Sequence, residues 1–264
     1  MPSTTLFLIT LVTMSLVCEA QTSRRNARPG GPGGGMGGPP TPRMDKAMAK
    51  LFGEHKNFSA DMLMENKTAR GVLSMPGKMA FSEGKSRLEM DMTKIKGEEM
   101  PPGAAEQMKQ MGMGEMVSIS RPDKKESYLI YPGLKSYVAV PTEEGAETKA
   151  AAAEGDVKRT EIGKETVDGR ECTKYKVMVK DDAGKEQEFT VWAAQDLKGF
   201  PVKMETMNEG MPTTMTYNNM SFSKPEQSLF EVPSDFKRYA DMGTMMQEAM
   251  MKRFAPPGGA PRQE

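Results

Sequence analysis

The chain has 264 residues, which is enough for one domain of about 200 residues with a sizeable core once two poorly folding ends are set aside. Lys plus Arg and Asp plus Glu number 36 each, so the formal net charge is +0 and no overall field draws the chain to nucleic acid or to an anionic membrane. Two cysteines and one histidine leave little material for metal or nucleophilic chemistry, so we expect neither an enzyme nor a protein with a cofactor.

The N-terminus has the pattern of an export signal. Leu6–Val17 is an apolar run that is too short to span a membrane, and Cys18-Glu-Ala20 after it is a small-x-small pattern suited to cleavage after Ala20. We therefore predict a signal peptide over residues 1–20, export to the periplasm and no transmembrane segment. In the alternative, Cys18 is a lipid attachment point and the exported chain is anchored.

Both ends of the remaining chain have the composition of unfolded segments. Residues 21–42 are rich in Arg, Gly and Pro, and residues 255–264 (APPGGAPRQE) are similar. Such segments cannot bury a core. We predict a linker over 21–42, a disordered tail over 255–264 and a single domain over 43–254.

The domain begins with helical periodicity and then turns to alternation. Apolar residues from Met44 to Phe52 at helical spacing predict an amphipathic helix over Arg43–His55. Short alternating segments separated by turn residues follow, as in antiparallel strands. The strands predicted in this half begin at Phe58 and continue as Val72–Met75, Lys78–Phe81, Arg87–Thr93, Met116–Ser120, Glu126–Tyr131 and Leu134–Val140.

Two segments interrupt the strands. In Gly97–Gly114, the residues Ala104, Ala105, Met108 and Met111 form a short helical face, which would cover an open sheet. The acidic, alanine-rich segment Thr142–Asp156 is predicted to be either a mobile loop or one surface helix.

The second half contains five more predicted strands and a terminal amphipathic helix from Met242 to Phe254. About a dozen strands with short connections favour a mainly β fold of the α+β kind, because sheets this wide usually curl. We predict a curved antiparallel sheet, or half-open β-barrel, covered by short amphipathic helices. The strands of this half are Lys158–Thr166, Arg170–Lys180, Glu186–Ala193, Phe200–Met207 and Thr213–Phe222.

Landmarks in the last third resemble those of a known group of proteins. They are Gly169-x-x-Cys172-x-x-Tyr175, Val191-Trp192, Phe200-Pro-Val-Lys203 and Leu229-Phe-Glu-Val-Pro233 with Phe236. Their order resembles the lipoprotein-carrier-like families, which include the bacterial periplasmic outer-membrane lipoprotein carriers and related exported domains of unknown function. The resemblance covers Phe58–Tyr239 and implies a half-closed barrel with helices over its mouth. In the carriers, the concave apolar surface receives acyl chains.

Methionine is the one residue type in excess, with 27 copies. It could line a cavity for irregular hydrophobic ligands, because its side chain is flexible and polarizable. Thioethers also select Cu(I), and three M-x-M pairs are present. The plainest explanation is that Met replaces Leu and Ile in an ordinary core. The pairs are Met62/Met64, Met90/Met92 and Met111/Met113.

These observations predict an exported, non-enzymatic binding protein that shelters a hydrophobic ligand, either a lipid or a lipoprotein acyl chain. Two alternatives stay open: a methionine-rich copper-binding protein, and an envelope protein with a structural or partner-binding role and no small ligand. The oligomeric state stays open as well. The candidate lining residues are Met62, Met64, Leu88, Met90, Met92, Met108 and Met111.

Three single residues are predicted to be structural. Cys172 has no histidine nearby to act as a base, although Lys174 and Lys176 on the same strand face could lower its pKa. Trp192 is expected to pack in the core, or else to stand at the mouth of the cavity or under the terminal helix. His55 is expected to be a solvated residue at the end of the first helix.

Overall fold

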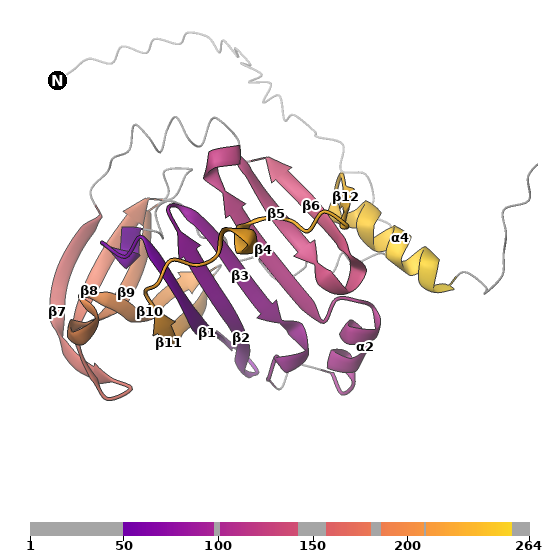
Figure 1. Cartoon of the computed structure of the whole chain (residues 1–264). Coiled ribbons are helices and arrows are strands. Elements are labelled where there is room, and N and C mark those ends of the chain that lie inside the picture. Colours follow the sequence, from indigo (N-terminus) through magenta and orange to yellow (C-terminus); the bar gives the residue numbers. More distant parts are fainter. Residues whose placement is uncertain (1–49, 98–100, 142–156, 181–185, 209, 255–264) are drawn as a thin grey trace, which may run out of the picture. The chain divides into compact units, whose positions relative to one another are not determined.

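The computed structural model describes residues 50–97, 101–141, 157–180, 186–208 and 210–254, all within one compact unit, Thr41–Glu264 (Figure 1). The predicted signal peptide, linker and tail, the acidic segment 142–156 with its two alternatives, and residues 43–49 of the predicted first helix lie outside the described residues. The strands are β1 (Asn57–Thr68), β2 (Gly71–Ser82), β3 (Lys85–Asp91), β4 (Glu115–Arg121), β5 (Glu126–Tyr131), β6 (Ser136–Pro141), β7 (Lys158–Val167), β8 (Arg170–Lys180), β9 (Glu186–Ala194), β10 (Phe200–Asn208), β11 (Met211–Ser221) and β12 (Lys237–Tyr239).

Two α-helices and six short 3-10 turns accompany the described strands. Neither helix has the length and apolar content needed to cross a bilayer, within the described part of the chain. These elements are η1 (Lys50–Phe52), η2 (Met92–Lys94), α2 (Ala104–Gln110), η3 (Pro122–Lys124), η4 (Pro132–Leu134), η5 (Gln195–Leu197), η6 (Gln227–Phe230) and α4 (Met242–Phe254).

All twelve described strands belong to one sheet, in the order β12-β6-β5-β4-β3-β2-β1-β11-β10-β9-β8-β7. Neighbours pair antiparallel throughout, except that β12 pairs parallel with β6. Tight turns join several hairpins: Glu83-Gly84 and Asp168-Gly169 both have positive φ, as a two-residue type I′ turn requires. The predicted mainly β fold, with a curved antiparallel sheet, is confirmed.

The strand sequences put apolar side chains on both faces of the sheet. Along β1 the buried residues are every second one from Phe58 to Met64. In other strands, adjacent residues belong to different apolar clusters: Met79 and Ala80 in β2, and Met116 and Val117 in β4. Because successive side chains of a strand point to opposite faces, the two clusters lie on the two sides of one sheet.

The position of η1 shows which face is concave. Strands β1 and β7 are five positions apart in the sheet and would be separated by about 24 Å if it were flat. Yet the ring of Phe52 lies 4.7 Å from that of Phe58 on β1, and the Leu51 carbonyl accepts a hydrogen bond of 3.4 Å from Arg159 on β7. A single turn can contact both strands only if the sheet curves around it, so η1 lies on the concave side. The larger cluster, which contains Leu51 and Phe52, therefore fills the concave face.

A C-terminal segment crosses the convex face. Phe230, in η6, is fully buried there, and Arg87 of β3 donates a hydrogen bond of 2.9 Å to the Leu229 carbonyl. Arg121 of β4 is 6% exposed at its side chain; it donates to the Phe230 carbonyl at 3.0 Å and pairs with Asp123 and Glu231. We call residues 227–236 the convex segment.

Helices cover part of the concave face near the β6 edge. Met108, from α2, and Met113, just after it, pack partly buried against the concave cluster. After the convex segment the chain pairs with β6 through β12 and turns into α4, whose Met245 is only 1% exposed within the same cluster. The chain therefore passes around the β6 edge from one face to the other.

Three predicted boundaries in the first half were wrong. Val72–Met75 and Lys78–Phe81 are parts of one strand, β2, which runs through Pro76-Gly77. The strand predicted to reach Thr93 ends at Asp91, whose carboxylate accepts a hydrogen bond of 3.0 Å from the Thr93 amide and caps η2. The strand predicted from Leu134 begins at Ser136, after η4.

The first helix and its histidine also differ from the prediction. The described end of Arg43–His55 is the single turn η1, followed by Gly53 with φ 60°. His55 is not simply solvated. Its Nε2 is buried and has no hydrogen-bond partner among the described residues, and its ring lies 5.3 Å from that of Phe200 and 4.8 Å from that of Phe222.

Replacement of Arg121 by Met should loosen the convex segment and lower the free energy of unfolding by about 1–3 kcal/mol, because the hydrogen bond to the Phe230 carbonyl is lost, Asp123 loses the guanidinium and Glu231 keeps only Lys124. Arg121 also lowers the pKa of Asp123 to about 2. That stabilisation is present above the ordinary value of 3.8 and is lost as the pH falls through about 2. Urea unfolding of the native chain at decreasing pH should show this loss, and the R121M chain should show less of it.

Lys135→Met is the matched control. It removes an exposed ion pair between Lys135 and Asp235 on the same segment, with side chains 71% and 59% exposed. Exposed pairs of this kind contribute about 0–1 kcal/mol. Equal destabilisation by K135M and R121M would contradict the assigned role of Arg121.

Candidate functional site

The concave face is rich in buried methionine, and we call it the methionine face. Neighbouring strands bring these side chains together: Met64 of β1 is paired with Met75 on one side and Met215 on the other, and Met215 is in turn paired with Met204. Each methionine is 8% exposed or less. The ten buried methionines of the face are Met62, Met64, Met75, Met79, Met90, Met92, Met116, Met204, Met215 and Met245.

The structure brings together most of the predicted lining residues. Met62, Met64, Met90 and Met92 are buried members of the methionine face, and Leu88 and Met108 are partly buried against it. Among the described residues that pack against this face, Met113 takes the place expected for Met111, which is the C-cap of α2.

Sequence reasoning missed six of the ten buried methionines. Met75 and Met79 share a face within β2, a strand that was divided in two by its Pro-Gly pair. Met204 and Met215 do alternate with polar neighbours, and this signal is available in their strands, whereas Met116 is followed by the apolar Val117 and has no such signal. Met245 was recognised as part of the terminal helix but was not assigned to the site.

The two halves of the concave face differ in chemistry. Near η1, the rings of Phe52, Phe58, Phe200 and Tyr217 contact one another with centroids 4.7–6.1 Å apart, and all four are 2% exposed or less. Burial raises the pKa of the Tyr217 phenol, so this hydroxyl stays neutral. We call this closed region the aromatic half.

The other half, over β2–β6, has a border of partly buried apolar side chains. They lie on the strands, on η4, next to η2 and around α2, where the packed cluster meets less crowded surface. A hydrophobic ligand would find there a soft, adaptable wall, because thioether side chains have three rotatable bonds and polarizable sulfur. The border residues are Leu73, Leu88, Ile95, Met108, Met113, Leu129, Leu134 and Val140.

The His, Cys, Asp and Glu side chains give little support for a metal site. Over the described ranges, no group of three or more His, Cys, Asp or Glu side chains is placed to hold a metal ion. The thioethers of the M-x-M pairs are the remaining soft donors, and Met62 and Met64 share the concave face. These sulfurs pack in an apolar cluster, where they fit a core or a ligand wall.

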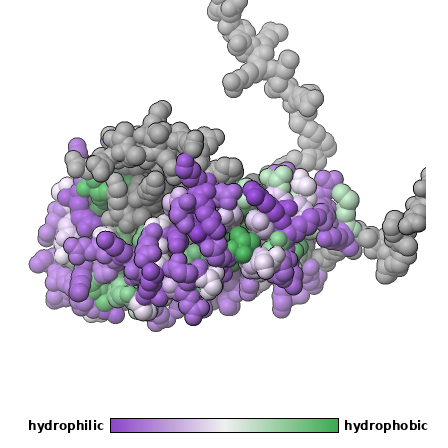
Figure 2. Space-filling model, turned by 45° about the horizontal axis from the view of Figure 1, so that its top comes forward, coloured by the Kyte–Doolittle hydropathy of each residue, from purple (hydrophilic) through white to green (hydrophobic). Residues whose placement is uncertain are grey.

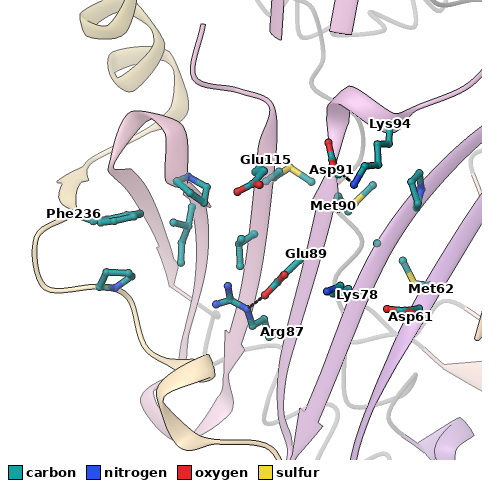
Figure 3. Close-up of a pocket in the computed structure, with 17 residues that line it drawn as sticks. Asp61, Met62, Lys78, Arg87, Glu89, Met90, Asp91, Lys94, Glu115 and Phe236 are labelled. Carbon is teal, nitrogen blue, oxygen red and sulfur yellow. Dashed lines mark hydrogen bonds and ion pairs between the residues drawn. The ribbon is translucent and has the colours of Figure 1, made fainter. Parts of the chain in front are cut away.

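A separate groove lies on the convex face, beside the convex segment (Figure 3). Its volume is about 720 Å³, within the usual range for small-molecule sites. One end is apolar, with Val117, Ile130 and Phe236. The floor carries charges of both signs, several of them paired, such as Arg87 with Glu89 at 2.6 Å. The charged lining residues are Asp61, Lys78, Arg87, Glu89, Asp91, Lys94 and Glu115.

This groove offers hydrogen bonds to a polar ligand but no concentrated charge of one sign. Only two of the predicted lining residues, Met62 and Met90, border it. The surface seen in Figure 2 is likewise mainly hydrophilic, with hydrophobic side chains in small separate patches.

Cys172 and Trp192 have structural surroundings. Cys172 is 1% exposed, and burial raises the pKa of its thiol, which agrees with the expected structural role and not with the alternative of a thiol activated by nearby lysines. Lys174 and Lys203 instead lie over the Trp192 ring, at 4.6 and 4.3 Å from its centroid. The Trp192 Nε1 donates a hydrogen bond of 2.9 Å to Glu165. Trp192 is thus buried beneath cross-strand neighbours.

A family model described as a domain of unknown function, DUF4412, matches residues 64–198, which is 135 of the 264 residues. The chain belongs to this family. The match runs from the first strand through β9 and therefore includes most of the methionine face. No curated protein sequence matches the chain.

Several solved structures are similar in fold. A LolA-superfamily protein from Nitrosomonas europaea is 10% identical, with 69% of this chain and 93% of that chain covered and a TM-score of 0.35. The lipoprotein LppX of Mycobacterium tuberculosis is 12% identical, with 66% and 89% covered and a TM-score of 0.37. A putative outer membrane lipoprotein-sorting protein domain from Vibrio parahaemolyticus is 13% identical, with 69% and 92% covered and a TM-score of 0.35. The chain is thus similar to members of the carrier-like group that its sequence resembles.

Met204→Ala should lower the free energy of unfolding by about 2–5 kcal/mol, because it leaves a cavity in the methionine face. Met207→Ala on the same strand is the matched control: Met204 is 0% exposed and Met207 is 58% exposed. The control should change the free energy of unfolding by about 0.5 kcal/mol or less. Urea denaturation measures both, and similar losses in the two variants would show that Met204 does not pack as described.

Proposed function

We propose that this protein binds a hydrophobic ligand, a lipid or the acyl chain of a lipoprotein, on its methionine face. The observation that carries the proposal is the difference in packing between the two halves of the concave face. Four aromatic rings in direct contact fill the aromatic half, although Tyr175, Leu197 and Met220 at its margin are also partly buried, whereas over β2–β6 flexible methionines meet a partly buried apolar border. The ligand lies over β3–β6, next to α2 and α4, where Leu88, Leu129 and Met108 are only partly covered.

Methionine in these strands itself supports an adaptable surface. In β-strands, β-branched and aromatic residues are the favoured apolar choices, whereas burying Met costs more rotamer entropy than burying Leu or Ile. A face designed only for stability would therefore use fewer methionines. A face that must fit acyl chains of differing length and saturation gains from side chains that repack easily.

The family resemblance suggests the same kind of ligand. In the outer-membrane lipoprotein carriers that the sequence resembles, the concave apolar surface receives acyl chains. In this proposal, the chain is exported to the periplasm, loses residues 1–20 and then receives acyl chains on its own concave surface. Binding is non-covalent and no chemical step is involved, so the role is that of a carrier or a binding protein and not of an enzyme.

The double variant L88Q/M108Q tests the site, because it makes two border side chains polar without emptying the core. We expect about tenfold weaker binding of a dansyl-labelled fatty acid, which corresponds to about 1.4 kcal/mol. Fluorescence titration measures the dissociation constant, and urea denaturation shows whether the fold is kept. The apolar exchange L88M/M108L should bind like the native chain and so separates polarity from shape.

Leu229→Gln on the convex face is the control, since Leu229 is also partly buried but packs against the other cluster. The assignment to the methionine face would be refuted if L229Q weakened fatty-acid binding as much as L88Q/M108Q does. It would also be refuted if none of these variants weakened binding. Stoichiometric copper in the purified native protein, with no bound lipid, would favour the soft-metal alternative instead.

A further inference from the structure

The two halves of α4 have different surroundings. The first half packs on the sheet: Met245 is 1% exposed, and Met242 and Met246 are partly buried against the methionine face. In the second half, Met250 and Met251 are 55% and 59% exposed. Figure 1 shows the helix beside β12 with its last turns directed away from the sheet. Exposing two large apolar side chains next to each other on a helix is unfavourable in water unless something covers them.

The apolar stripe of α4 is continuous from the concave face to this exposed end. Met242, Met246 and Met250 follow each other at intervals of four residues and therefore lie along one side of the helix. The stripe begins against the methionine face and ends in solvent. A hydrophobic molecule at the exposed end would thus be adjacent to an apolar path toward the proposed ligand site.

The local charge at this end is positive, although the whole chain has a formal net charge of +0. From Ala249 to Phe254, the end of the helix, the sequence contains Lys252 and Arg253 and no acidic residue. The acidic residue of the preceding turn, Glu248, is already paired with Lys237 at 2.6 Å and with Lys252 at 2.9 Å. The exposed end therefore combines adjacent methionines with an excess of basic residues.

We propose that the exposed end of α4, Ala249–Phe254, docks on an anionic lipid bilayer. Helices that lie in a membrane interface combine a short apolar face with Lys and Arg, and each basic residue near an anionic surface strengthens binding about fivefold. Charge complementarity selects the anionic bilayer as the occupant. Docking adds to the proposed function, because it brings the methionine face next to the source of its ligand.

Co-sedimentation with vesicles tests this docking, with the chain as purified from the exported fraction. Vesicles of phosphatidylglycerol and phosphatidylethanolamine should carry the native chain down at low salt, and pure phosphatidylcholine vesicles should carry little of it. The double variant M250Q/M251Q should bind the anionic vesicles at least tenfold more weakly, because its apolar contacts are lost. Lys252→Gln should weaken binding about fivefold, and added salt should weaken the native chain further.

Met207→Gln is the matched control, because Met207 is equally exposed, at 58%, but lies on β10. It should bind vesicles like the native chain. The proposal is overturned if anionic vesicles do not bind the native chain at low salt, if M250Q/M251Q binds as tightly as the native chain, or if M207Q loses as much. Failure of the docking proposal can be told apart from failure of the ligand site. Vesicle binding is tested here, whereas the fatty-acid titration of L88Q/M108Q is made without vesicles.

Discussion

The structure depends on one constraint: a single sheet carries apolar side chains on both faces, so both faces must be covered. All twelve described strands belong to that sheet. On the concave side, η1, α2 and α4 contribute Phe52, Met108 and Met245 to the cover. On the convex side, the segment 227–236 lays Phe230 over β4 and β5 and is held by Arg87 and Arg121. Residues 227–254 serve both faces by passing around the β6 edge.

The cover is uneven, and the unevenness suggests the function. The aromatic half is closed by rings in direct contact, with Phe52 and Phe200 fully buried. The methionine-rich half is bordered by side chains that are only partly buried, and its helices are short or reach beyond the sheet. Fixed aromatic packing gives the fold a rigid end, whereas thioether side chains leave the other end adaptable. The convex groove, with paired charges of both signs, is a different kind of surface.

The sequence predicted the fold well where each strand has one polar face and clear turns. Arg170–Lys180 matches β8, and Asp168-Gly169 forms the expected turn. It failed at Pro76-Gly77, which looks like a turn but lies inside a central strand. A Cβ on Gly77 would lie 2.5 Å from the Glu89 carbonyl oxygen, so glycine is needed there for close approach of two strands.

The cover of the convex face was also beyond sequence reasoning. Leu229–Pro233 was recognised as a family landmark, but its position depends on contacts with Arg87 and Arg121, which are more than a hundred residues away in the chain. No periodic pattern reports such a contact. The candidate site was predicted in part, because alternation identified Met62, Met64 and Met90 as facing one way, while the partners on β10 and β11 become evident only from the strand order.

The central claim is that the methionine face, and not the convex groove, holds a hydrophobic ligand. The most direct measurement is to irradiate the native protein with a photoreactive diazirine fatty acid and to map the labelled residues by peptide mass spectrometry. The account predicts labels on concave residues of β3, β5 and α2, such as Leu88, Leu129 and Met108, and their loss when unlabelled fatty acid competes. Labels confined to the convex groove around Val117, Ile130 and Phe236, or labels that competition does not reduce, would contradict it.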